Sequence, residues 1–194
     1  MKNLITLIAL ILAPAICHGQ EADYQTRILI HKQFTQKATK IGIAGWSIIP
    51  DASTVNPLRW LIVCGPMYKD SSQWLELMVG VMTNGMTNIE KEKGDAMDFI
   101  FDVRSKKDFS KGEIAFETFF RKKRSAFISS ASYYITKSKK LVVACGVESD
   151  YFFTKSDVRY GPRFMITIHP ITFIQTYHFK QGGDIVRTYI VVNL

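Results

Sequence analysis

The sequence has 194 residues, of which 47% are hydrophobic, 12% aromatic and 22% charged, and its formal net charge is +8. This length suits a single domain, and the hydrophobic fraction excludes global disorder. The modest excess of basic residues favours contact with anionic surfaces without specifying one.

The first 19 residues are typical of a secretory signal peptide. Lys2 gives a short positive region, residues 4–13 form an apolar run, and small residues precede a polar stretch. We expect cleavage after Gly19. A membrane-spanning helix needs roughly 20 apolar residues, and Pro14 interrupts the run too early for one. The pattern therefore predicts an exported protein.

The remainder of the chain is predicted to be all-β. Turn-forming residues recur along it, and hydrophobicity alternates with period two between them, which is typical of strands. In residues 97–104, for example, Phe99 and Phe101 alternate with Asp98 and Asp102. We expect about ten strands (8–10) in an antiparallel up-and-down barrel. The predicted division is a signal peptide at 1–19, an N-terminal segment at 20–40 and a barrel domain at 41–194. Within the N-terminal segment, residues 22–40 could form a short helix or an extra strand.

The alternation shows that each strand has one apolar face, but not whether that face meets lipid or a protein core. Many predicted strands have 10 to 13 residues, whereas globular strands usually have about 5 or 6 and membrane-crossing strands need about 9 to 11. Aromatic residues also lie near the strand ends, as an interfacial girdle requires. These features favour a transmembrane barrel with a structural, adhesive or narrow-transport role.

Two alternatives remain open at this stage. The first is a soluble periplasmic or secreted β-barrel or sandwich that binds an apolar ligand inside. The second is a membrane-embedded lipid-modifying enzyme, which would require a histidine within hydrogen-bond reach of a serine or a carboxylate. Enzyme activity is therefore undecided, with the balance against it.

The signal peptide, the alternating strands and the final segment RTYIVVNL together resemble small bacterial outer-membrane β-barrel proteins, over roughly residues 40–194. The resemblance implies the bacterial outer membrane as the location, with the periplasm or the extracellular space as the alternative, and the lipid bilayer as the partner. Members of that family commonly end on an aromatic residue. This chain ends on Leu194, although Ile190 and Val192 keep the expected spacing.

Charged residues alternate with the apolar ones, and in a barrel they would point inward. A barrel of eight to ten strands leaves a lumen just wide enough for side chains. In such a barrel, opposite charges would pair and close the lumen. In a soluble sheet, the same charged residues would form a solvated face. The predicted lumen charges are Arg59, Glu76, Asp98, Asp102, Arg104, Glu117, Arg121, Glu148, Asp150, Arg163 and Arg187.

The densest basic run is Arg121, Lys122, Lys123 and Arg124. It is a candidate for contact with anionic lipid or polysaccharide headgroups, because arginine can hold a phosphate in a bidentate manner. We expect no nucleic acid partner, since the chain is exported and has no recognised binding motif.

The sequence assigns no catalytic residue, metal site or cofactor. The histidines are few and no nucleophile-elbow motif accompanies them. After signal cleavage only Cys64 and Cys145 remain, in the apolar contexts LIVCG and VVACG. This favours two buried or lipid-facing thiols, and a single disulfide is the alternative.

Overall fold

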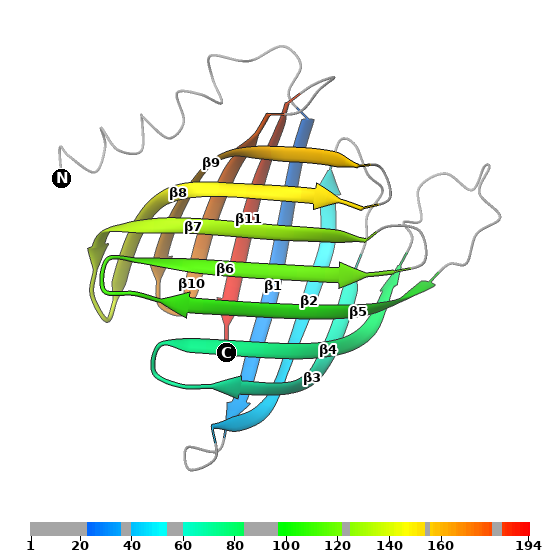
Figure 1. Ribbon diagram of the computed structural model, residues 1–194, viewed down its shortest axis with the longest axis horizontal. Coiled ribbons are helices and arrows are strands. Elements are labelled where there is room, and N and C mark those ends of the chain that lie inside the picture. The colour runs from blue at the N-terminus through cyan, green and yellow to red at the C-terminus, as the bar shows by residue number, and fades with distance from the viewer. Residues whose placement is uncertain are drawn as a thin grey trace.

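The computed structural model describes residues 23–35, 40–53, 60–83, 97–121, 125–153, 156–179 and 184–194. The predicted all-β fold is confirmed, and the strands close into a barrel (Figure 1). No helix among these residues is long and apolar enough to cross a membrane. The strands are β1 (Asp23–Thr35), β2 (Ile41–Ser53), β3 (Leu61–Lys69), β4 (Gln73–Thr83), β5 (Met97–Asp108), β6 (Gly112–Phe120), β7 (Ala126–Lys137), β8 (Leu141–Phe152), β9 (Asp157–Ile168), β10 (Ile171–His178) and β11 (Ile185–Asn193).

The strands follow one another around the barrel in chain order, and consecutive strands are antiparallel. β1 and β11 close the barrel as a parallel pair, with Asp23 opposite Ile185 and His31 opposite Asn193. A meander reverses its direction at every turn, so the first and the eleventh strands must point the same way. An odd strand number therefore requires this one parallel pair.

The eleven strands exceed the predicted range of eight to ten, and the additional strand is β1. It lies in the segment 20–40, for which the sequence allowed a short helix or an extra strand. Gln25, Leu29 and His31 are buried on its inner face, so polar and apolar residues share that face. As a result, β1 starts and β11 ends at opposite ends of the barrel. Ten strands starting near residue 41 would instead have begun and ended at the same end.

The connections between strands differ in length at the two ends of the barrel. At one end they span 36–40, 70–72, 109–111, 138–140 and 169–170, and we call this the short-turn end. At the other they span 54–60, 84–96, 121–125, 153–156 and 179–184, and we call this the long-loop end. β5 extends to Asp108 and β6 begins at Gly112, so residues 109–111 form a short turn between them.

Large apolar side chains cover the outside of the barrel, and charged side chains lie inside it. β5 shows this most clearly, because Phe99 is 85% exposed and Phe101 43% exposed, whereas Asp98 and Asp102 are buried. The alternation predicted for residues 97–104 is therefore present. The outer face is thus rich in apolar side chains, whereas the inner face carries both charged and apolar ones. In a water-soluble barrel the outer face is polar.

The interior of the barrel is packed with side chains. In Figure 1, β4 to β9 cross the front of the barrel, and β10, β11, β1 and β2 pass behind them at a steep angle. Leu29 and Val191 from the rear strands join Met78 and Ile100 from the front strands in one buried apolar cluster. The two walls are therefore close enough for their side chains to meet.

Cys64 and Cys145 are both free and exposed. They occupy outward positions in β3 and β8, which are not neighbouring strands. The two thiols therefore do not form the single disulfide that the sequence allowed.

Candidate functional site

The described charged residues that we expected in the lumen do lie on its inner face. Arg59 and residues 122–124 lie outside the described residues, so the predicted headgroup contact there stays a prediction. Arg121 points inward, with its Nη1 3.6 Å from Oδ2 of Asp98. Of the others, Glu76, Asp98, Asp102, Arg104, Glu148, Asp150 and Arg187 are buried, and Glu117 and Arg163 are half-buried.

A five-residue cluster lies toward the long-loop end of the lumen, and we call it the Glu148 cluster. It comprises Glu148 and Asp150 of β8, Arg163 of β9, His178 of β10 and Arg187 of β11. Arg163 donates to Glu148, and Arg187 donates to Asp150. Nε2 of His178 lies 3.1 Å from the second carboxylate oxygen of Glu148. Four adjacent strands are thus joined by charged hydrogen bonds, which are stronger than neutral ones.

Glu148, Asp150 and His178 could in principle hold a metal ion, because each offers a ligand atom and these atoms lie within 4.8 Å of one another. Oδ1 of Asp150 and Nδ1 of His178 are buried without a hydrogen-bond partner. However, both oxygens of Glu148 are engaged, and two arginines already balance the two carboxylates. A divalent cation would therefore meet two neighbouring guanidinium charges, so the residues present do not fit a cation well.

A second group of charges occupies the middle of the lumen. Arg104 of β5 contacts Asp102 at 2.8 Å and Glu117 of β6 at 3.0 Å. Its guanidinium carbon also lies 4.3 Å from the centre of the Trp46 ring, in a cation–π arrangement. Trp46 belongs to β2. The contact therefore reaches across the lumen, because β2 and β5 are separated by two strands.

A third group surrounds Glu76, a residue that is 0% exposed, toward the short-turn end. One carboxylate oxygen accepts a hydrogen bond from Gln33 at 2.7 Å and lies 2.8 Å from Nε2 of His31. The other accepts a hydrogen bond from the indole N–H of Trp46 at 2.7 Å. The His31 and Trp46 rings are stacked with their centroids 3.9 Å apart. Three donors from β1 and β2 thus hold this one carboxylate.

A fourth group lies at the short-turn rim of the lumen. Nζ of Lys106 is 2.7 Å from Glu113, and the Tyr134 hydroxyl donates to the same carboxylate at 3.1 Å. The four groups together follow the lumen from one end to the other. In each group a carboxylate contacts an arginine, a lysine or a histidine.

Neither of the two lumen histidines has a nucleophilic side chain as a hydrogen-bond partner among the described residues. His31 and His178 each lie within hydrogen-bond reach of a carboxylate, which was the feature expected of the enzyme alternative. Both imidazoles are buried, and no described serine, threonine or cysteine bonds to either of them. Nucleophilic catalysis would require such a group beside the base.

Sequence reasoning missed His31, Trp46 and His178 as lumen residues. His178 is in phase with Thr176 on the inner face of β10, and both are 0% exposed. The alternation of inward and outward side chains along β10 could therefore have placed His178 inside the barrel. His31 carried no such signal, because its segment was not assigned as a strand.

Comparison of this chain with protein-family models, with curated proteins and with solved structures finds no match.

Proposed function

We propose that this protein is a transmembrane β-barrel of a bacterial outer membrane, with its lumen closed by side chains and a structural role in the envelope. The observation that carries the proposal is the apolar outer face of a wall whose charged side chains point inward. Phe99 is 85% exposed on the outer face, whereas the neighbouring Asp98 is 4% exposed and faces the lumen. Contact with hydrocarbon stabilises such an outer surface, and contact with water does not.

The position of the aromatic side chains supports the proposal. At the long-loop end, the ring centroids of Phe101 and Phe120 lie 6.2 Å apart on the outer wall, and those of Phe120 and Phe153 lie 6.3 Å apart. Exposed aromatic side chains at the short-turn end include Phe34, Tyr68, Phe109 and Tyr133. Two aromatic girdles that flank an apolar band are characteristic of membrane-spanning barrels.

The dimensions of the wall agree with this location. The strands have 8 to 13 residues, and a tilted strand needs about 9 to 11 to cross a bilayer. A closed barrel leaves no sheet edge with unpaired backbone groups in the hydrocarbon. Longer connections at one end and short turns at the other also follow the usual asymmetry of outer-membrane barrels.

The packed interior favours a structural role over solute transport. The apolar cluster around Met78 joins the two walls, and the Glu148 cluster links four strands toward the long-loop end. A permeant solute would have to separate these contacts. The same contacts hold the wall strands together, so the lumen acts as a core for the barrel.

Fractionation and gel mobility test the membrane assignment. We expect the expressed protein in the outer-membrane fraction, with an unboiled band that shifts on boiling, because a closed barrel resists detergent at room temperature. Recovery as a soluble protein without a heat-dependent shift would overturn the assignment.

Planar-bilayer recording tests the closed lumen separately. We expect purified protein to insert without a steady conductance, since paired side chains fill the lumen. A stable ohmic conductance at all voltages would contradict the closed state while leaving the membrane assignment intact.

A further inference from the structure

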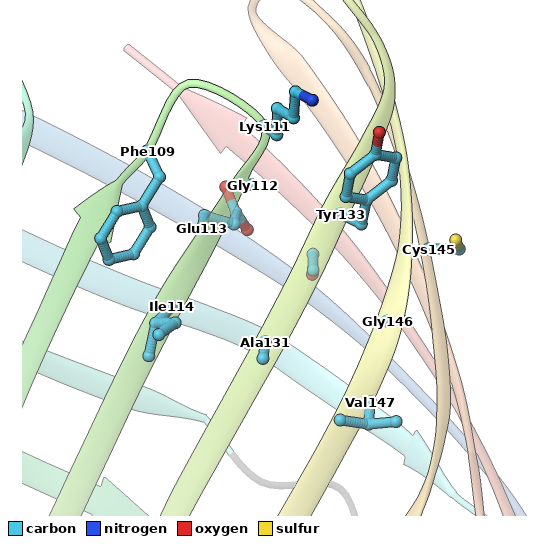
Figure 2. Close-up of a pocket in the computed structure, with 11 residues that line it drawn as sticks. Phe109, Lys111, Gly112, Glu113, Ile114, Ala131, Tyr133, Cys145, Gly146 and Val147 are labelled. Atoms are coloured by element: carbon cyan, nitrogen blue, oxygen red, sulfur yellow. The ribbon is translucent and has the colours of Figure 1, made fainter.

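An apolar groove lies on the outer wall of the barrel, across β6, β7 and β8, next to the short-turn end (Figure 2). It is a shallow depression that is open to its surroundings, with a volume of about 450 Å³. The lining surface is almost entirely apolar and opens onto the same face as the rest of the apolar wall. Glu113 also lines the groove, although its carboxylate contacts Lys106 and Tyr134 in the lumen.

Small residues create the groove. Gly112 and Ala131 occupy outward positions on adjacent strands, and their small size leaves room for the depression between the larger side chains. Larger outward side chains stand around this depression in Figure 2, Phe109 on one side and Tyr133 toward the short-turn end. The result is a shallow groove on the outer wall, bordered by these larger side chains.

Basic side chains lie where the groove reaches the short-turn end. Lys111 lines the groove there, and in Figure 2 its ammonium group and the Tyr133 hydroxyl lie at the same end. Nζ of Lys107 is 5.6 Å from the centre of the Phe109 ring. Lys111 makes no ion pair with any other described residue. Within the described part of the chain, every lysine lies toward this end: Lys32, Lys40, Lys69, Lys106, Lys107, Lys111, Lys137, Lys139 and Lys140.

We propose that the groove binds an acyl chain of an anionic glycerophospholipid, with the lipid phosphate held by Lys107 and Lys111. This inference rests on the proposed membrane location. An apolar groove on a lipid-facing wall takes a hydrocarbon chain, and lysines near a membrane surface attract anionic headgroups. The aromatic rings of Phe109 and Tyr133 lie between these two regions, at the level where aromatic side chains meet headgroups.

Native mass spectrometry of the full chain tests this site. The protein is purified in detergent, mixed with phosphatidylglycerol or with phosphatidylcholine of the same acyl chains, and the retained lipid is counted. We expect preferential retention of one phosphatidylglycerol. The double variant Lys107→Gln/Lys111→Gln should lower that retention about tenfold, the size expected for loss of one or two surface charge contacts.

Two further variants separate the groove from general surface charge. Lys139→Gln/Lys140→Gln removes the same charge from a neighbouring turn and should change retention less than about twofold. Ala131→Leu fills the floor of the groove and should reduce retention of both lipids, whereas Val158→Leu on the outer face of β9 should not. Equal effects of the two lysine pairs, or equal retention of both lipids, would overturn the proposal.

The heat-dependent band shift and the entry of the protein into vesicles are measured on the same samples. If the protein shows the heat-dependent band shift and enters vesicles but retains no phosphatidylglycerol, the groove proposal alone fails. If it neither shifts nor enters vesicles, both proposals fail. Preferential binding of lipopolysaccharide over phosphatidylglycerol would also overturn the assignment of a glycerophospholipid.

Discussion

Nε2 of His31 lies 2.8 Å from Oε1 of Glu76, although 45 residues separate them in the chain. Nδ1 of the same imidazole lies 3.3 Å from Oδ1 of Asn193 at the end of β11. The side-chain amide of Asn193 in turn donates to the carbonyl oxygen of Pro170. This chain of contacts links β1, β4 and β11, so it fastens the parallel closing pair to the opposite wall of the barrel.

We expect Glu76→Gln to lower the free energy of unfolding by about 3 kcal/mol, because it leaves buried donors facing an amide nitrogen. Urea unfolding in lipid vesicles, followed by tryptophan fluorescence, measures the change. Glu117→Gln is the matched control. Glu117 is half-buried and Arg104 keeps Asp102 as a partner without it, so we expect a loss below about 1 kcal/mol. Similar midpoints for the wild type and Glu76→Gln would contradict the proposed importance of this carboxylate.

Gly146 is expected to be intolerant of a side chain. It pairs with Ser132 of β7, and a Cβ atom at Gly146 would overlap the carbonyl oxygen of Ala131. The strands would have to separate, so we expect Gly146→Ala to cost about 1 to 3 kcal/mol. At Gly45 the nearest atom to an added Cβ is the Val63 carbonyl oxygen, 3.6 Å away. Gly45→Ala should therefore fold normally, as judged by the fraction of unboiled protein in the compact band.

Asp70 stabilises the turn between β3 and β4 in a pH-dependent way. Hydrogen bonds from the backbone amides of Ser72 and Gln73 lower the pKa of its carboxyl below the usual value of 3.8. A lowered pKa in the folded state adds stability at neutral pH, and this contribution disappears as the pH falls through the folded value. Asp70→Ala should therefore unfold at a lower urea concentration than the wild type at about pH 7.

The difference between Asp70→Ala and the wild type should shrink at about pH 3, where the carboxyl begins to take up its proton. Urea midpoints at the two pH values measure this. Ser110→Ala, in the turn between β5 and β6, controls for a general effect of acid on short turns. A difference that is constant across this pH range would show that the ionised carboxyl is not responsible.

The faces of the longer strands could be predicted from the sequence, because period two fixes the side on which each residue lies. β5 follows this rule, with Asp98, Asp102 and Arg104 buried. β1 could not be assigned in the same way, since Gln25, Leu29 and His31 share one face. The ten strands predicted without β1 are an even number. An even-numbered meander closes with an antiparallel pair, so the parallel pair of β1 and β11 was not expected.

The pairing of the lumen charges could not be predicted either. Arg187 donates to Asp150, 37 residues earlier in the chain, and Glu76 meets His31 across three strand boundaries. Such partners depend on the strand register and on the distance between opposite walls, and neither is encoded in local alternation. The sequence therefore predicted which residues point inward, and only the folded barrel shows which of them meet.

For the proposed membrane barrel, the unequal ends predict its orientation. Outer-membrane barrels generally expose their longer loops to the outside and keep short turns on the periplasmic side. Ser156 lies at the long-loop end and Ser71 at the short-turn end, and both are exposed. In a background with Cys64→Ala and Cys145→Ala, we expect a membrane-impermeant maleimide to label Ser156→Cys on whole cells and Ser71→Cys only after lysis. Because β1 starts at the long-loop end, this orientation also places Asp23 on the outside. The reverse labelling pattern would place the long loops in the periplasm and the lysine-rich end at the cell surface.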